Sequence, residues 1–286
     1  MDTKAKSTKN SFMPISATTD AKYARLLELL GHCDGLGVAF SGGVDSTLLL
    51  AAAKQVLGER VVAFTARSAI HPDSELSLSM ELARQLKVEQ VVFNTDELQD
   101  PLFVANGPLR CYYCKRRLFA IMARQARQVG IHALAHGANL DDAGDYRPGL
   151  QAANELGIAA PLMEAGLSKR EIRTLAKKMG LPNWDKPAMA CLASRVPYDT
   201  PISPALLTRI DQAESLVRDV IQGPCRVRHH GSVARIEVEP AVQSELLRPA
   251  SRRRVVDALR ALGYDHVCLD LEGYVAGKMN RGLNPE

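Results

Sequence analysis

Short runs of β-branched and apolar residues alternate with stretches of helical periodicity over the first two thirds of the chain. This pattern predicts strands at residues 35–40, 61–65, 89–94, 132–136 and 158–161. Helices are predicted at residues 45–57, 73–86, 113–129 and 145–156, and Ser168 with Glu171 forms a capping box for a further helix. Strands that alternate with helices pair in parallel. The sequence therefore predicts an α/β fold with a doubly wound, mostly parallel sheet.

The pattern changes after Trp184. Residues 185–204 are spaced by prolines and are too irregular for a helix, which is typical of a functional loop. A helix at 206–220, two short strands at 227–238, a helix at 242–262 and a strand at 266–271 follow, and together they predict a small α+β domain. We thus expect a tail at residues 1–20, a nucleotide-binding domain at 21–200, and a domain at 201–286 for substrate binding and oligomerisation.

The composition is typical of a globular protein. Hydrophobic residues make up 46% of the 286 positions and charged residues 24%, which excludes disorder along the whole chain. The net charge of +4 is too small to indicate a nucleic-acid partner. No uncharged apolar run approaches the roughly 18 residues that cross a bilayer, and the N-terminus lacks the apolar core of a signal peptide. We expect a cytoplasmic protein with neither a membrane nor a nucleic-acid partner.

A glycine-rich segment, FSGGVDST at residues 40–47, lies where the first predicted strand meets a helix. Gly42 and Gly43 let backbone amides approach an anion, and the helix start adds the positive end of its dipole. Ser41 and Ser46 add hydroxyl donors, while Asp45 fits beside an anion if it holds a metal ion. An ordinary glycine turn is the plainer alternative, and the Walker pattern is absent. The segment predicts a phosphate site.

The hexapeptide SGGVDS in this position resembles the PP-loop of the N-type ATP pyrophosphatases. The resemblance implies cleavage of ATP between its α- and β-phosphates, with adenylation of a carboxylate, amide or base carbonyl. It also implies that Mg²⁺ assists the reaction. The residues expected to bind ATP are Ser41, Gly42, Gly43, Asp45 and Ser46.

A polar segment, GANLDDAGDYRPG at residues 137–149, follows the fourth predicted strand. Its polar side chains include Asn139, Asp141, Asp142, Asp145 and Arg147. In an open α/β sheet, ligands bind at the carboxyl ends of the strands, where this segment and the phosphate loop meet. The acidic residues can coordinate Mg²⁺ or cap the next helix, and the arginine can pair with a phosphate. We expect Asp142 to bind metal together with Asp45.

Three of the six cysteines form a possible site. Cys111 and Cys114 form a C-x-x-C motif before a basic helix, and Cys191 lies far downstream. Three thiolates suit an iron–sulfur cubane with one open iron, whereas structural zinc takes a fourth ligand. Separate, unrelated thiols are the plainer alternative. Cys191 is also a candidate nucleophile or sulfur source, because Arg195 four residues on favours the thiolate.

Longer blocks carry a closer resemblance. SGGVDS, CYYC, GANLDDAGDYRPG and PAMACLASRVPY occur in this order, followed by RVR at 226–228 and ARIE at 234–237. With these blocks the chain is similar to the LarE family of ATP-dependent sulfur transferases, from Tyr23 to the C-terminus. The resemblance implies that pyridinium-3,5-biscarboxylic acid mononucleotide is activated as an acyl-adenylate. It further implies that Cys191 supplies sulfur for a thiocarboxylic acid, a step in nickel-pincer nucleotide cofactor biosynthesis.

Two routes for the sulfur remain open. In the single-cysteine form of the family, the C–S bond of the residue matching Cys191 breaks and leaves dehydroalanine after one turnover. Members with the additional C-x-x-C are thought to hold a [4Fe-4S] cluster whose open iron delivers sulfide, and the presence of Cys111 and Cys114 favours that route here. The resemblance also implies a homo-oligomer, a sulfur donor and cofactor-pathway proteins as partners.

Six further residues are candidates for binding substrate or metal: Tyr112, Arg195, Arg226, Arg228, Glu214 and Glu237. Arg226 and Arg228 alternate on a predicted strand, so they share a face that can bind a phosphate, although a solvated basic strand is the alternative. Tyr112 is a candidate for stacking on a pyridinium ring, or for simple packing. Glu214 and Glu237 resemble the acidic positions of the family that bind metal between subunits.

Two other functions compete with this interpretation. A PP-loop tRNA thiolase also combines an SGGVDS-like loop with cluster-binding cysteines, but only residues 115–117 and 252–254 form dense basic tracts. A nucleotide-sensing module without catalysis would keep the phosphate loop and have no use for Cys191.

Overall fold

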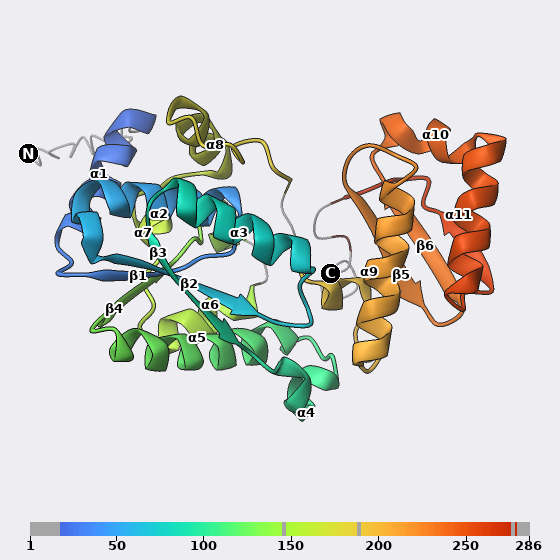
Figure 1. Ribbon diagram of the computed structural model, residues 1–286, viewed down its shortest axis with the longest axis horizontal. Coiled ribbons are helices and arrows are strands. Elements are labelled where there is room, and N and C mark those ends of the chain that lie inside the picture. Colours follow the sequence, from blue (N-terminus) through green and yellow to red (C-terminus); the bar gives the residue numbers. More distant parts are fainter. Residues whose placement is uncertain (1–17, 145–146, 188–189, 276–277, 279–286) are drawn as a thin grey trace, which may run out of the picture.

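The computed structural model of the protein describes residues 18–144, 147–187, 190–275 and 278 (Figure 1). Its larger sheet has four strands in the order β3-β2-β1-β4, and every neighbouring pair is parallel. The strands are β1 (Leu36–Ala39), β2 (Val61–Arg67), β3 (Glu89–Asn94) and β4 (Ala133–His136). The predicted α/β fold with a parallel sheet is confirmed.

Helices cover both faces of this sheet (Figure 1). One face carries α1 (Thr19–Gly31), α2 (Val44–Leu57), α3 (Asp73–Gln85), α7 (Pro161–Glu164) and α8 (Lys169–Lys178). The other face carries α5 (Arg110–Gln128) and α6 (Pro148–Glu155), and α4 (Pro101–Val104) precedes α5. The helix α2 is buried along most of its length, because α1 and α8 cover the side that faces away from the sheet. Its start is therefore a rigid position for the loop that follows β1.

A second, smaller sheet lies toward the C-terminus, with β5 (Cys225–His230), β6 (Val233–Val238) and β7 (His266–Leu269). The pair β5–β6 is antiparallel and β6–β7 is parallel. Three helices pack with it: α9 (Pro204–Arg218), α10 (Gln243–Leu247) and α11 (Pro249–Ala261). Their shared core includes Val217, Val227, Ile236 and Leu259, each at most 3% exposed. Short 3₁₀ helices are η1 (Gly58–Arg60), η2 (Glu97–Gln99), η3 (Leu140–Gly144), η4 (Leu192–Arg195) and η5 (Pro240–Val242).

Several predicted elements are wrong in position or extent. The strand expected at 158–161 is a single bridge between Ala135 and Ala159, because Pro161 then starts α7. The helix expected at 113–129 begins at Arg110, so the C-x-x-C motif lies inside α5 rather than before it. The helix expected at 242–262 is broken in two at Pro249, which cannot continue the preceding turn.

The N-terminal helix α1 was not among the predicted elements. The tail expected at 1–20 lies mostly outside the described residues, and Thr19 already belongs to α1. The capping box of Ser168 and Glu171 is confirmed, and Glu171 also accepts two hydrogen bonds from Lys22 of α1. Within the described ranges, no helix is long and apolar enough to cross a membrane.

Candidate active site

The phosphate loop joins β1 to α2, and its own side chains hold its shape. Gly42 has a φ of 69°, a left-handed conformation that favours glycine. The hydroxyl of Ser46 donates to the carbonyl of Gly43 at 3.1 Å and accepts from the backbone amide of Ser41 at 3.3 Å. The hydroxyl of Thr47 donates to the same carbonyl at 2.9 Å. The glycines and the buried start of α2 thus present backbone at a helix N-terminus, where anions bind.

Asn183, which is distant from the phosphate loop in the sequence, forms hydrogen bonds with it. Its amide nitrogen donates to the carbonyl of Gly42 at 3.0 Å and to the hydroxyl of Thr47 at 2.9 Å. The side chain is buried, and its amide oxygen has no partner among the described atoms. The loop therefore depends on the segment that leads toward Cys191.

Carboxylates gather beside the phosphate loop. Asp45 forms an ion pair with Lys169 at the start of α8, while its second oxygen, Oδ1, is buried without a partner. Burial raises the pKa of Asp45, Lys169 opposes this, and the nearby charge of Asp142 adds to it. Asp142 accepts from the backbone amide of Asn139 at 3.0 Å and pairs with Arg147 at 2.8 Å. A divalent cation between Asp45 and Asp142 would relieve their repulsion and satisfy the unpartnered oxygen. Asp145, the other carboxylate expected in this segment, lies outside the described residues.

Gly137, which follows β4, packs directly against the phosphate loop. A Cβ atom at this position would lie 2.9 Å from the backbone nitrogen of Ser46 and 3.2 Å from its Cα. We expect Gly137→Ala to displace the start of α2 and to weaken ATP binding about tenfold, since overpacking costs about 1–3 kcal/mol. Isothermal titration with ATP measures this. Gly107→Ala is the control, because nothing lies within 4 Å of its added Cβ, and equal affinities of both variants would contradict the prediction.

The three candidate thiols are close enough for their charges to act on one another. Cys111 and Cys114 are one turn apart on α5, and all three thiols are half-buried. Burial raises the pKa of Cys111 and of Cys114, and the charge of a Cys191 thiolate raises both further. The residue after Cys191, Leu192, donates its amide to the carbonyl of Ile70, three residues beyond the end of β2, at 2.8 Å. Within the described ranges, no three His, Cys, Asp or Glu side chains are grouped to hold a metal ion.

Arg195 is the last residue of η4, at the end of the segment 190–195 that we call the Cys191 loop. Its side chain is only 1% exposed. Its Nε and Nη2 donate to the two carboxylate oxygens of Glu214 at 2.7 and 3.0 Å. Its Nη1 donates to the carbonyls of Ala190 and Cys191 at 2.6 and 3.0 Å. Glu214 is equally buried and also pairs with Arg218 at 3.4 Å. A substrate at Arg195 or a metal ion at Glu214 would have to displace these partners.

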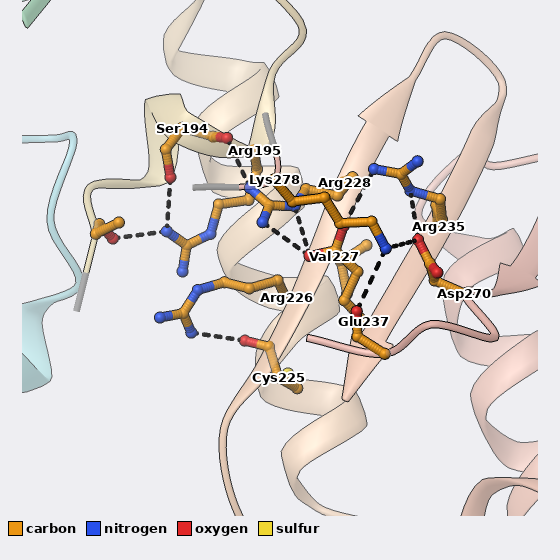
Figure 2. Close-up of polar contacts among 12 residues, drawn as sticks. Ser194, Arg195, Cys225, Arg226, Val227, Arg228, Arg235, Glu237, Asp270 and Lys278 are labelled. Carbon is orange, nitrogen blue, oxygen red and sulfur yellow. Dashed lines mark hydrogen bonds and ion pairs between the residues drawn. The ribbon is translucent and has the colours of Figure 1, made fainter. Parts of the chain in front are cut away.

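The arginines of β5 are buried rather than solvated, and Figure 2 shows their polar contacts. Arg228 donates twice to Glu237, at 2.9 and 2.8 Å, and once to the carbonyl of Ser194 at 2.9 Å. Glu237 is fully buried and also pairs with Arg235 at 3.1 Å. Arg226 donates to the carbonyl of Cys225 at 2.7 Å and stacks over the ring of Tyr274. A metal ion at Glu237 would therefore compete with two arginines.

Tyr112 lies on the exposed side of α5. Its hydroxyl donates to Glu155 of α6 at 2.7 Å, and the guanidinium of Arg116 lies 5.4 Å from its ring centroid. These contacts join α5 to α6 at the surface. Stacking of this ring on a substrate stays a prediction.

Comparisons of the sequence with known proteins identify relatives of this chain. The asparagine synthase family matches residues 34–107, the part that contains the phosphate loop. An uncharacterised protein of Synechocystis sp. is 39% identical over 92% of this chain and 98% of its own length. The pyridinium-3,5-bisthiocarboxylic acid mononucleotide synthase of Lactiplantibacillus plantarum is 37% identical over 93% of this chain and 96% of its own length. The chain belongs to the LarE family. It is an ATP-dependent enzyme with a PP-loop domain.

This LarE protein also matches a glutamine-hydrolysing synthase over part of its length. A glutamine-hydrolysing GMP synthase of Aeropyrum pernix is 29% identical over 66% of this chain, but the match covers only 40% of that protein. This more distant likeness therefore covers only part of each protein.

Four residues of this LarE site were missed by the sequence interpretation. Lys169 and Asn183 contact the phosphate loop from α8 and beyond, and no motif signals either one. Lys115 follows the C-x-x-C motif, and its positive charge opposes the raised pKa of Cys114. Burial lowers the pKa of His136, at the end of β4, to about 4, and Lys115 contributes. The charge of Lys115 thus acts on both His136 at the end of β4 and the thiol of Cys114.

Proposed function

We propose that the protein adenylates a carboxylate of pyridinium-3,5-biscarboxylic acid mononucleotide and converts it to the thiocarboxylic acid. The synthase of L. plantarum, which matches over nearly its full length, carries the related product in its name. The supporting observation in this chain is that the phosphate loop after β1 and the Cys191 loop beside the end of β2 lie at one edge of the sheet. One site can therefore activate a carboxylate and deliver sulfur to it.

In the first step, a substrate carboxylate oxygen attacks the α-phosphorus of ATP, and pyrophosphate leaves. The backbone of Gly42 and Gly43 and the start of α2 stabilise the negative charge of the phosphates. Asp45 and Asp142 are the residues that would hold Mg²⁺, which supplies charge neutralisation for the leaving pyrophosphate. Lys169 keeps Asp45 in place through their ion pair.

In the second step, the Cys191 thiolate attacks the acyl carbon and AMP leaves, which gives a thioester. Loss of the Cα proton of Cys191 then breaks its Cβ–S bond and releases the thiocarboxylate, with dehydroalanine left in the chain. Cys111, Cys114 and Cys191 are the residues that would hold a [4Fe-4S] cluster, and their side chains would have to move together to do so, because the described structure does not group them as a metal site. Such a cluster would supply sulfide from outside the protein, so that Cys191 stays intact.

The source of the sulfur is testable by mass. Incubation of anaerobically purified protein with Mg-ATP and the biscarboxylate nucleotide, with and without added sodium sulfide, should yield pyrophosphate and thiocarboxylate. If Cys191 is the source, the protein loses the mass of one H₂S, and this loss maps to the Cys191 peptide. If a cluster is the source, iron and acid-labile sulfide are present and the protein mass is unchanged. Consumption of neither ATP nor the acid would contradict the proposed function.

We also propose the finer features that the family resemblance implies: a homo-oligomer in the cytoplasm, with a sulfur donor and cofactor-pathway proteins as partners. Gel filtration with light scattering measures the oligomeric state.

A further inference from the structure

The loop that carries Cys191 is tied to the smaller sheet by two buried guanidinium groups. Arg195 holds the carbonyls of Ala190 and Cys191 on one side and the carboxylate of Glu214 on the other. Glu214 in turn accepts a hydrogen bond from the backbone amide of Val227 in β5 at 3.1 Å. A continuous set of hydrogen bonds therefore runs from the backbone of Cys191 to the edge strand β5 of the smaller sheet.

A second set of hydrogen bonds also joins the Cys191 loop to the smaller sheet. Arg228 of β5 donates to the carbonyl of Ser194 on η4, and Glu237 of β6 fixes the other side of its guanidinium (Figure 2). Glu237 is itself held by Arg235, which also pairs with Asp270 at 3.5 Å. The two sets contact the Cys191 loop at residues 190–191, just before η4, and at residue 194, within η4.

The geometry of these contacts favours a role in holding the loop. A guanidinium has donors in a rigid plane, so it can bind a carboxylate with one edge and carbonyl groups with the other. In Arg195 both sides are occupied by protein, and its charge is balanced by Glu214. These contacts indicate that Arg195 fixes the position of the Cys191 loop.

We propose that Arg195 and Arg228 are positioning residues, which hold the Cys191 loop at the smaller sheet so that the sulfur meets the activated carboxylate. The purpose that we assign to the two arginines rests on the proposed function, whereas their contacts with the Cys191 loop do not depend on it. It differs from the substrate contacts expected for these arginines from sequence. A displacement of the reacting atom by about 1 Å can reduce a rate about 100-fold, so a loosened loop should impair sulfur transfer.

The test uses Arg195→Lys and Arg228→Lys, which keep the charge opposite each glutamate but lose the planar set of donors. Matched controls are Arg218→Gln and Arg254→Gln, because Arg218 pairs with Glu214 from the outside and Arg254 forms an exposed ion pair with Asp219. Neither arginine forms a hydrogen bond or ion pair with the described residues of the Cys191 loop. The first readout is the rate at which iodoacetamide alkylates Cys191, measured on its peptide with Cys268 as internal reference. We expect faster alkylation in the lysine variants and the wild-type rate in the controls.

The second readout separates the two chemical steps. We expect the lysine variants to release pyrophosphate at close to the wild-type rate and to form thiocarboxylate about 100-fold more slowly. If Arg195→Lys fails to fold, Glu214→Gln replaces it, since the amide keeps one acceptor for Arg195.

Two results would overturn the proposal. Wild-type alkylation of Cys191 in both lysine variants would mean that neither arginine holds the loop. A raised KM for the nucleotide in pyrophosphate release, with alkylation unchanged, would assign the arginines to substrate binding. If the wild-type protein forms no thiocarboxylate, the proposed function fails, while the alkylation comparison still decides the positioning role.

Discussion

Replacement of Cys191 by alanine is expected to abolish thiocarboxylate formation while pyrophosphate release continues. The thiol is absent from the first step, in which the substrate carboxylate attacks ATP. It is the nucleophile of the second step in the sacrificial route and one of three ligands in the cluster route, so either route ends without it. Loss of a nucleophile reduces a rate by at least about 1,000-fold. Pyrophosphate and thiocarboxylate should be measured in the same reaction mixture.

The matched control for this variant is Cys268→Ala, which removes an exposed thiol of the smaller sheet. It should behave as the wild type in both assays. Thiocarboxylate formed at the wild-type rate by Cys191→Ala would refute the central role of this side chain. Loss of both products in a folded Cys191→Ala protein would instead place the thiol in the adenylation step.

Asp45→Asn should instead impair both products, with pyrophosphate release reduced by about 100- to 1,000-fold. The substitution removes the charge that would hold Mg²⁺, and it also breaks the ion pair with Lys169. Because adenylation comes first, thiocarboxylate formation should fall to the same extent. Pyrophosphate release at saturating ATP and a range of Mg²⁺ concentrations measures the effect.

Asp20→Asn controls for the loss of a carboxylate that pairs with a lysine, since Asp20 forms an exposed ion pair with Lys178 far from the phosphate loop. This variant should keep full activity. If high Mg²⁺ restores Asp45→Asn to the wild-type rate, the carboxylate contributes to metal affinity alone. If the variant is fully active at low Mg²⁺, the proposed metal role of Asp45 is wrong.

The sequence predicted the parts of the site that are encoded locally. The phosphate loop is recognisable because its glycines and hydroxyls must be adjacent, and the parallel strands follow from the alternation of elements. The start of α5 was placed too late because Arg110 and Cys111 carry no capping signal, and no side-chain cap is formed there. Pro249 was the available signal for the break between α10 and α11.

The contacts that join distant segments could not be predicted in this way. Lys169 reaches Asp45 across 124 positions, and Asn183 reaches Gly42 across 141. Each is an ordinary polar residue in the sequence, and only the packing of α8 against α2 brings it to the loop. The role of Glu214 and Glu237 as metal ligands was implied by the family resemblance and stays a prediction, while their pairing with two arginines each could not be read from the sequence.

The amide of Asn183 has a practical consequence for dividing the protein. A fragment that ended before residue 183 would contain every residue of the PP-loop motif, yet the carbonyl of Gly42 and the hydroxyl of Thr47 would lose their shared donor. A transplanted PP-loop unit from this enzyme must therefore extend past Trp184 to retain its native nucleotide-binding conformation.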